Sequence, residues 1–123
     1  MEIAPSALVV DDDRSLRLLC RVNLELDGFR VREAATVAEA TAALDEESPD
    51  IVLLDVHLGS EGADDLLERV RRDGVPVLLV TGTADISGYA ERADELLAKP
   101  FEPVALLAAV RRLCAGRSST VGL

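Results

Sequence analysis

The feature that most constrains the fold is a run of four aliphatic residues, IVLL at positions 51–54, between Asp50 and Asp55. A short apolar run bounded by turn signals and rich in Val and Ile is typical of a strand buried on both faces. Such strands belong to parallel sheets that helices cover on both sides. Because ligands of open α/β sheets bind at the carboxyl ends of the strands, Asp55 is the first candidate functional residue.

Other segments of the chain alternate between strand-like runs and stretches with helical periodicity. The expected strands are 7–10, 29–34, 51–55, 75–81 and 96–98, and the expected helices are 14–27, 36–47, 63–72 and 102–114. This alternation predicts an α/β fold with a doubly wound, five-stranded parallel sheet and right-handed crossovers. We expect residues 1–117 to form one domain, the chain to fray from Gly116, and residues 118–123 to be a C-terminal tail.

Composition and charge exclude several classes of function. The 123-residue chain has a net charge of −10 and only 2% aromatic residues. The negative charge argues against non-specific binding to nucleic acid or to an anionic membrane, and the lack of aromatic residues argues against base stacking. No apolar stretch approaches the roughly 18 residues of a membrane span, and the start of the chain does not resemble a signal peptide. We therefore expect a cytoplasmic protein with no nucleic-acid or membrane partner.

Polar side chains follow the predicted strands at the points where the strands end. Asp11 and Asp12 follow the first strand, Asp55 ends the third, Thr81 ends the fourth and Lys99 follows the fifth. In a parallel sheet these ends share one edge, so the side chains should converge. Two carboxylates about 4 Å apart repel by about 4 kcal/mol at an effective dielectric constant near 20. Mg²⁺ would relieve that repulsion, and a lysine and a hydroxyl suit phosphoryl oxygens, so the pattern predicts phosphoryl chemistry on a carboxylate.

Four motifs together resemble the receiver domains of two-component response regulators. They are LVVDD at 8–12, DIVLLD at 50–55, VTG at 80–82 and KPF at 99–101. Each motif alone is weak evidence, but four in the correct order are highly specific. The resemblance extends through Arg112 and implies a flavodoxin-like fold with strand order 2-1-3-4-5.

The resemblance implies a phosphoacceptor and a metal site. Asp55 would accept a phosphoryl group from a histidine kinase or a histidine phosphotransfer protein. Asp11, Asp12 and Asp55, together with the backbone carbonyl of His57, would bind Mg²⁺. The protein would then be a signalling switch, and not an enzyme beyond its own phosphoryl transfer and dephosphorylation.

The resemblance also implies a route for the signal. Lys99 would pair with the phosphoryl group, and the Lys99–Pro100 peptide bond would be cis. Thr81 would move toward the phosphoryl oxygens. The output would be a changed protein-binding surface across residues 82–113, read by an unknown downstream protein or by a second copy in a homodimer.

Three features depart from the family pattern. Leu96 replaces the usual aromatic residue, and Gly59 and Ala63 replace the usual Pro and Gly of the loop after the third strand. The segment 82–95 is short by about one helical turn, which predicts an abbreviated fourth helix.

Two other functions remain open from the sequence. Leu96 and the short segment would suit a degenerate receiver that acts as a phosphorylation-independent docking module. Asp11 and Asp13 form an Asp-x-Asp pair after the first strand, as in a small aspartyl-phosphate phosphohydrolase of the haloacid-dehalogenase type. That class needs a longer chain with further acids late in the sequence, and the third strand carries the better acceptor.

Overall fold

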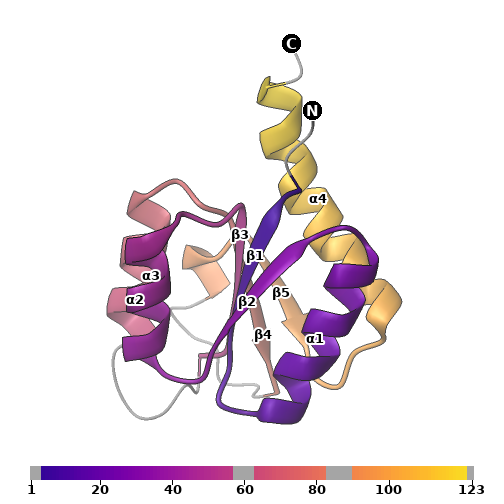
Figure 1. Cartoon of the computed structure of the whole chain (residues 1–123), viewed down its shortest axis with the longest axis horizontal. Coiled ribbons are helices and arrows are strands. Elements are labelled where there is room, and N and C mark those ends of the chain that lie inside the picture. The colour runs from indigo at the N-terminus through magenta and orange to yellow at the C-terminus, as the bar shows by residue number, and fades with distance from the viewer. Residues whose placement is uncertain (1–3, 57–62, 83–89, 122–123) are drawn as a thin grey trace.

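The computed structural model describes residues 4–56, 63–82 and 90–121, and it contains one parallel sheet with helices on both faces (Figure 1). Its strands are β1 (Ser6–Val10), β2 (Arg30–Ala34), β3 (Ile51–Leu54), β4 (Val77–Thr81) and β5 (Glu95–Ala98). Its helices are α1 (Arg14–Leu26), α2 (Val37–Glu46), α3 (Ala63–Arg72), the 3₁₀ turn η1 (Ala90–Arg92) and α4 (Pro103–Val121). The strand order β2-β1-β3-β4-β5 confirms the predicted topology.

The strand side chains alternate between two aliphatic cores, one on each face of the sheet. In β1, Leu8 and Val10 pack on the side of α2 and α3, whereas Ala7 and Val9 pack on the side of α1 and α4. Strands β3 and β4 follow the same alternation, and every residue of the three central strands is buried. Burial on both faces explains why these strands are continuous apolar runs in the sequence.

Local signals fix the start and the end of the helices that flank the sheet. The Asp13 side chain accepts hydrogen bonds from the backbone N–H groups of Ser15 (2.9 Å) and Leu16 (3.3 Å), and so caps α1. The chain leaves α1 through Gly28, whose φ of 95° favours glycine. Thr36 caps α2 by accepting from the Glu39 N–H at 3.1 Å, as the capping-box pattern predicts.

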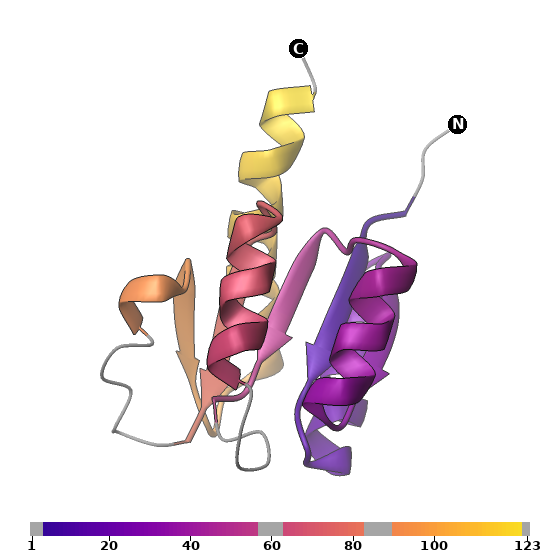
Figure 2. The same cartoon turned by 90° about the vertical axis from the view of Figure 1, so that its left-hand side faces the viewer.

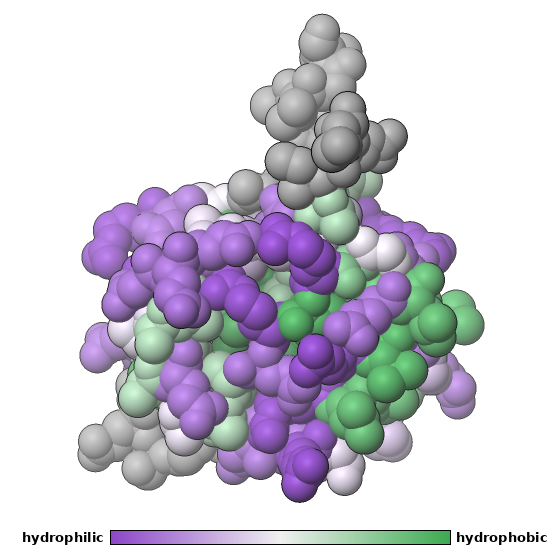
Figure 3. Space-filling view, viewed as in Figure 1, coloured by the Kyte–Doolittle hydropathy of each residue, from purple (hydrophilic) through white to green (hydrophobic). Residues whose placement is uncertain are grey.

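One exposed side of α1 is apolar, and it lies beside a largely polar surface in this view (Figure 3). Leu18, Val22 and Leu26 are 56%, 46% and 82% exposed, and they recur every four residues along one side of the helix. Leu19 is also exposed, at 38%. An apolar patch of this kind on a surface helix marks a place where another molecule can bind.

Part of the connection between β4 and β5 is held against α3. Arg92 of η1 forms ion pairs with Asp64 (2.7 Å) and Glu68 (3.0 Å) of α3, and its carbonyl accepts a hydrogen bond from Arg71. Within the described part of this connection only the 3₁₀ turn is helical, and the remainder of the predicted abbreviated helix lies outside the described residues.

The chain is helical beyond Gly116, from which it was expected to fray. Helix α4 continues to Val121, and its last turns extend beyond the body of the domain in two views (Figures 1 and 2). A glycine inside a helix costs about 1 kcal/mol relative to alanine, which weakens a helix without ending it. The proposed boundary at residue 117 therefore falls inside a helix, and the division into a domain and a tail stays a prediction. No helix in the described ranges combines the length and the apolar character needed to cross a membrane.

Candidate functional site

Two buried aspartates lie side by side where β1 and β3 end. The Asp11 N–H donates to the Ala34 carbonyl, and the Asp55 N–H donates to the Val10 carbonyl, each at 3.0 Å. These bonds continue the hydrogen-bond pattern of the sheet by one residue, so the sheet itself positions both carboxylates. The residues are only 2% and 5% exposed, respectively.

A third carboxylate joins them at the same edge. Asp12 is exposed, and one carboxylate oxygen from each of Asp11, Asp12 and Asp55 lies within 4.8 Å of the other two. Oxygen ligands of this kind are those that a hard divalent cation such as Mg²⁺ prefers. The donor set therefore fits Mg²⁺. The backbone carbonyl of His57, which was predicted to complete the set, lies outside the described residues.

Lys99, the only lysine in the chain, brings a positive charge to this group. Its Nζ atom lies 2.9 Å from Asp11 Oδ2 and 3.2 Å from Asp55 Oδ2. Its backbone N–H donates to the Thr81 carbonyl at 2.9 Å, which ties the end of β5 to the end of β4. Thr81 is buried, and the Lys99–Pro100 peptide bond is cis, as the resemblance implies. The sequence therefore predicted correctly that these strand ends converge.

Lys99 forms ion pairs with two of the three carboxylates, those of Asp11 and Asp55. Burial is the main influence on Asp11 and raises the pKa of its carboxyl group, against the opposing effects of the Asp13 N–H and Lys99. Burial also lowers the pKa of Lys99, but hydrogen bonds and the negative charges of Asp11 and Asp55 outweigh it and raise that pKa. Lys99 is therefore protonated. Burial makes the ionised form of Asp11 less favourable in free energy, and a bound cation would reduce that cost.

Two contacts that support the turn between β1 and α1 were not predicted from the sequence. The Asp13 N–H donates to Asp11 Oδ1 at 2.9 Å, in addition to the capping role of the Asp13 side chain. Arg17 Nη1 donates to the backbone carbonyl of Asp11 at 2.8 Å. A contact between a side chain and a backbone carbonyl leaves no recognisable pattern in a single sequence, so only the folded geometry reveals Arg17.

The family model of the response regulator receiver domain matches residues 7–111 of this chain. The chain belongs to this family. As a receiver domain it is part of two-component signal transduction, and the family consists of signalling domains rather than classical enzymes.

Named relatives and solved structures agree with this assignment. The receiver is 33% identical over 117 residues to the DNA-binding dual master transcriptional regulator RpaA of Synechocystis, covering 89% of this chain and 48% of that protein. It is 37% identical over 109 residues to the DNA-binding response regulator MtrA of Mycobacterium tuberculosis, covering 85% and 48%. A CheY-like receiver domain of Methanospirillum hungatei superposes with a TM-score of 0.88 at 28% identity, covering 96% of this chain and 99% of that one. The receiver domain of NtrX from Brucella abortus superposes with a TM-score of 0.81 at 26% identity, covering 89% and 98%.

The receiver spans about half the length of the curated relatives that it matches. The names of these two relatives describe DNA-binding proteins. The expected lack of a nucleic-acid partner therefore does not extend to whole proteins of this family. That expectation stays a prediction about the 123 residues of this chain. Leu96, at the position where the family usually carries an aromatic residue, lies on β5 opposite Leu79 of β4 and is 38% exposed.

Proposed function

We propose that this receiver is a phosphorylation switch in which Asp55 accepts a phosphoryl group from a histidine kinase or a histidine phosphotransfer protein. The observation that carries the proposal is the position of the Lys99 ammonium group, within hydrogen-bonding distance of both Asp11 and Asp55. This arrangement combines a carboxylate nucleophile, a cation for phosphoryl oxygens, and acids that suit Mg²⁺. We expect the switch to act in the cytoplasm.

The proposed transfer is a single displacement at phosphorus. A carboxylate oxygen of Asp55 forms the new bond to phosphorus, and the bond from phosphorus to the donor imidazole breaks, with its electron pair remaining on nitrogen. Lys99 pairs with the phosphoryl oxygens, while Asp11, Asp12, Asp55 and the His57 carbonyl are the proposed ligands of Mg²⁺. When bound, Mg²⁺ supplies positive charge to the phosphoryl oxygens. Positioning and charge carry such reactions, because the phosphoryl group needs little further chemistry from the protein.

A protein donor has an apolar surface to bind beside this site. A hollow of about 400 Å³ is lined by Leu16, Leu19, Lys99, Pro100 and Phe101. It lies between α1 and the chain after β5, next to the lysine that faces Asp55. The exposed leucines and valine of α1 continue the apolar surface away from the site. This surface supports a helical protein donor over a small molecule, because an amphipathic helix is bound by such a face.

The modification would change the charge balance at the carboxyl edge of the sheet. A phosphoryl group adds about −1.5 to −2 charges and three strong acceptor oxygens. Lys99 and the Thr81 hydroxyl would turn toward these oxygens, and the shift would pass to the surface across residues 82–113. The reader of that surface would be a downstream protein, a second copy, or a DNA-binding region of a longer chain such as the relatives' names describe.

The proposal is tested by incubating the chain with acetyl phosphate, with and without Mg²⁺, and following the intact mass. We expect a phosphoryl adduct that requires Mg²⁺, is abolished by a chelator and is absent from the Asp55→Asn variant. No adduct under any condition would support the phosphorylation-independent docking module. Repeated turnover of a generic phosphate ester would support the phosphohydrolase instead.

A further inference from the structure

We propose that Arg17 is a positioning residue for the metal site, because it fixes the peptide group from which Asp12 extends. This inference rests on the proposed function, since it concerns the binding of Mg²⁺ by Asp11, Asp12 and Asp55. Arg17 itself contributes no ligand atom. It acts through the backbone of the turn between β1 and α1.

Arg17 is held between two elements of the fold. It lies in the first turn of α1, and its side chain is only 14% exposed. Nη1 donates to the Asp11 carbonyl at 2.8 Å, and Nε donates to Glu33 Oε1 at 3.0 Å. One guanidinium group therefore joins the end of β1 to β2.

Three consecutive peptide groups of the turn are each held by a different bond. The peptide before Asp11 is fixed by the sheet, through the Asp11 N–H and the Ala34 carbonyl. The peptide after Asp12 is fixed by the bond from the Asp13 N–H to Asp11 Oδ1. The peptide between them carries the Asp11 carbonyl, which Arg17 holds. Rotation of this middle peptide would move Asp12, so the Arg17 bond determines where the Asp12 carboxylate points.

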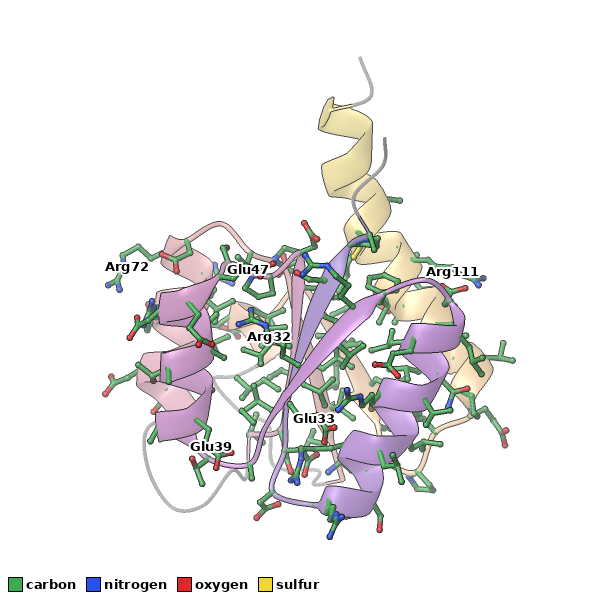
Figure 4. The ribbon with its side chains drawn as sticks, in the orientation of Figure 1. Arg32, Glu33, Glu39, Glu47, Arg72 and Arg111 are labelled. Atoms are coloured by element: carbon green, nitrogen blue, oxygen red, sulfur yellow. The ribbon has the colours of Figure 1, made fainter. Side chains whose placement is uncertain are left out.

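Glu33 keeps the Arg17 guanidinium in place. This residue lies near the carboxyl end of β2 (Figure 4), paired in register with Val9 of β1. It also accepts a hydrogen bond from Arg21 Nη1 at 2.9 Å. Arg21 and Arg17 together lower the pKa of Glu33, so the carboxylate is ionised at neutral pH. Arg21 also binds Glu33, but its described partners are Glu33 and Glu25 and not the backbone of the turn.

A positioning role and a purely electrostatic role of Arg17 predict opposite effects on Mg²⁺ affinity when the residue is replaced. A guanidinium group near three carboxylates repels a divalent cation, so removing its charge alone would strengthen Mg²⁺ binding. Removing the bond to the Asp11 carbonyl instead releases the middle peptide and weakens binding. Arg17 Nη1 donates to the backbone carbonyl of Asp11 and Nε donates to Glu33, so these two bonds do not occupy the carboxylate oxygens of the proposed metal ligands.

The test is the Mg²⁺ affinity of the folded protein, measured by calorimetry and by the NMR shifts of the turn amides. Arg17→Gln is compared with Arg21→Gln, which removes an equal charge beside the same residue, Glu33, but no bond to the turn. We expect Arg17→Gln to weaken Mg²⁺ binding by about 10- to 100-fold, the usual effect of removing a residue that orients a ligand. Arg17→Lys should fall between wild type and Arg17→Gln, because an ammonium group can still donate to the carbonyl. Arg21→Gln should stay near the wild-type value.

The outcomes separate this inference from the function on which it rests. Failure of the wild-type protein to bind Mg²⁺ would overturn the proposed function and this inference with it. Wild-type binding with an Arg17→Gln affinity equal to that of Arg21→Gln, or tighter than wild type, would overturn the inference alone. Urea unfolding establishes that each variant is folded under the conditions of the titration. Should Arg17→Gln not fold, Arg17→Lys and Glu33→Gln make the same comparison, and both should weaken binding.

Discussion

The ammonium group of Lys99 lies 3.2 Å from a carboxylate oxygen of Asp55, although 44 positions separate the two residues in the chain. The same nitrogen is 2.9 Å from Asp11. One side chain from the end of β5 thus compensates for carboxylates at the ends of β1 and β3. The pairing holds Asp55, the proposed phosphoacceptor, beside a positively charged side chain before any phosphoryl group arrives.

The first prediction concerns the stability that this pairing provides. Replacing Lys99 with Met leaves two buried carboxylates without their cation, and should lower the free energy of unfolding by about 1–3 kcal/mol in the absence of metal. Lys99→Arg keeps the charge and should lose less. Urea unfolding measures both variants. Addition of Mg²⁺ should raise the free energy of unfolding more for Lys99→Met than for wild type. Equal stability of Lys99→Met and wild type without metal would show that the lysine does not offset the carboxylate repulsion.

Mg²⁺ itself should stabilise the wild-type protein through its binding to the native state. At a concentration of 100 times its Kd, a ligand specific for the native state raises the free energy of unfolding by about 2.7 kcal/mol. Asp12→Asn should lose most of this gain, because the exposed Asp12 carboxylate belongs to the three-acid group.

Asp13→Asn is the matched control for Asp12→Asn. Asp13 is the neighbouring exposed acid, and asparagine caps a helix about as well as aspartate, so α1 should be unaffected. Unfolding with and without Mg²⁺ compares the two variants. An equal loss of the Mg²⁺ effect in both would mean that only the overall negative charge matters.

A third prediction is the effect of acid on the Arg17–Glu33–Arg21 cluster. The hydrogen bond from Arg21, together with the bond from Arg17 and the two positive charges, outweighs the opposing effect of burial and lowers the pKa of Glu33 below its ordinary value. A carboxyl group with a depressed native pKa contributes stability above its unfolded pKa and loses it as the pH falls through the native value. Wild type should therefore lose more stability than Glu33→Gln between pH 7 and acidic pH. Parallel pH profiles for the two proteins in urea unfolding would contradict the assigned role of Glu33.

The packing of α1 gives a fourth prediction with a matched pair on one helix. Leu24 is fully buried against the sheet and Leu26 is 82% exposed. Leu24→Ala should cost about 2–5 kcal/mol because it leaves a cavity in the core. Leu26→Ala should change stability by no more than about 0.5 kcal/mol, as for an ordinary surface position. A large loss for Leu26→Ala in urea unfolding would show that the apolar surface of α1 is covered in solution.

The sequence contains strong signals for the sheet and for its carboxyl edge. Continuous apolar runs such as 51–54 require burial on both faces, and parallel connections then bring Asp11, Asp55 and Lys99 to one edge. Strand limits differed from prediction by one or two residues, as at Glu95 of β5, because strand ends depend on pairing with neighbours. Periodicity located α1, α2, α3 and the start of α4 equally well, but not the end of α4.

Other features could not be predicted because they depend on the three-dimensional arrangement. The end of α4 was placed too early because Gly116 weakens a helix without a defined stop signal. The role of Arg17 depends on a backbone carbonyl six residues earlier, and on Glu33 from a different strand. An arginine in the first turn of a helix is common on a surface, so its spacing alone gave no reason to select it.

The most direct test of the account is to map the phosphorylated residue after incubation with acetyl phosphate and Mg²⁺. Peptide mapping by mass spectrometry, with Asp55→Asn in parallel, locates the modification. The account predicts one phosphoryl group on Asp55, formed only with Mg²⁺ and absent from the variant. A phosphoryl group on Asp11, Asp12 or another residue of the wild type, or undiminished modification of Asp55→Asn, would contradict it.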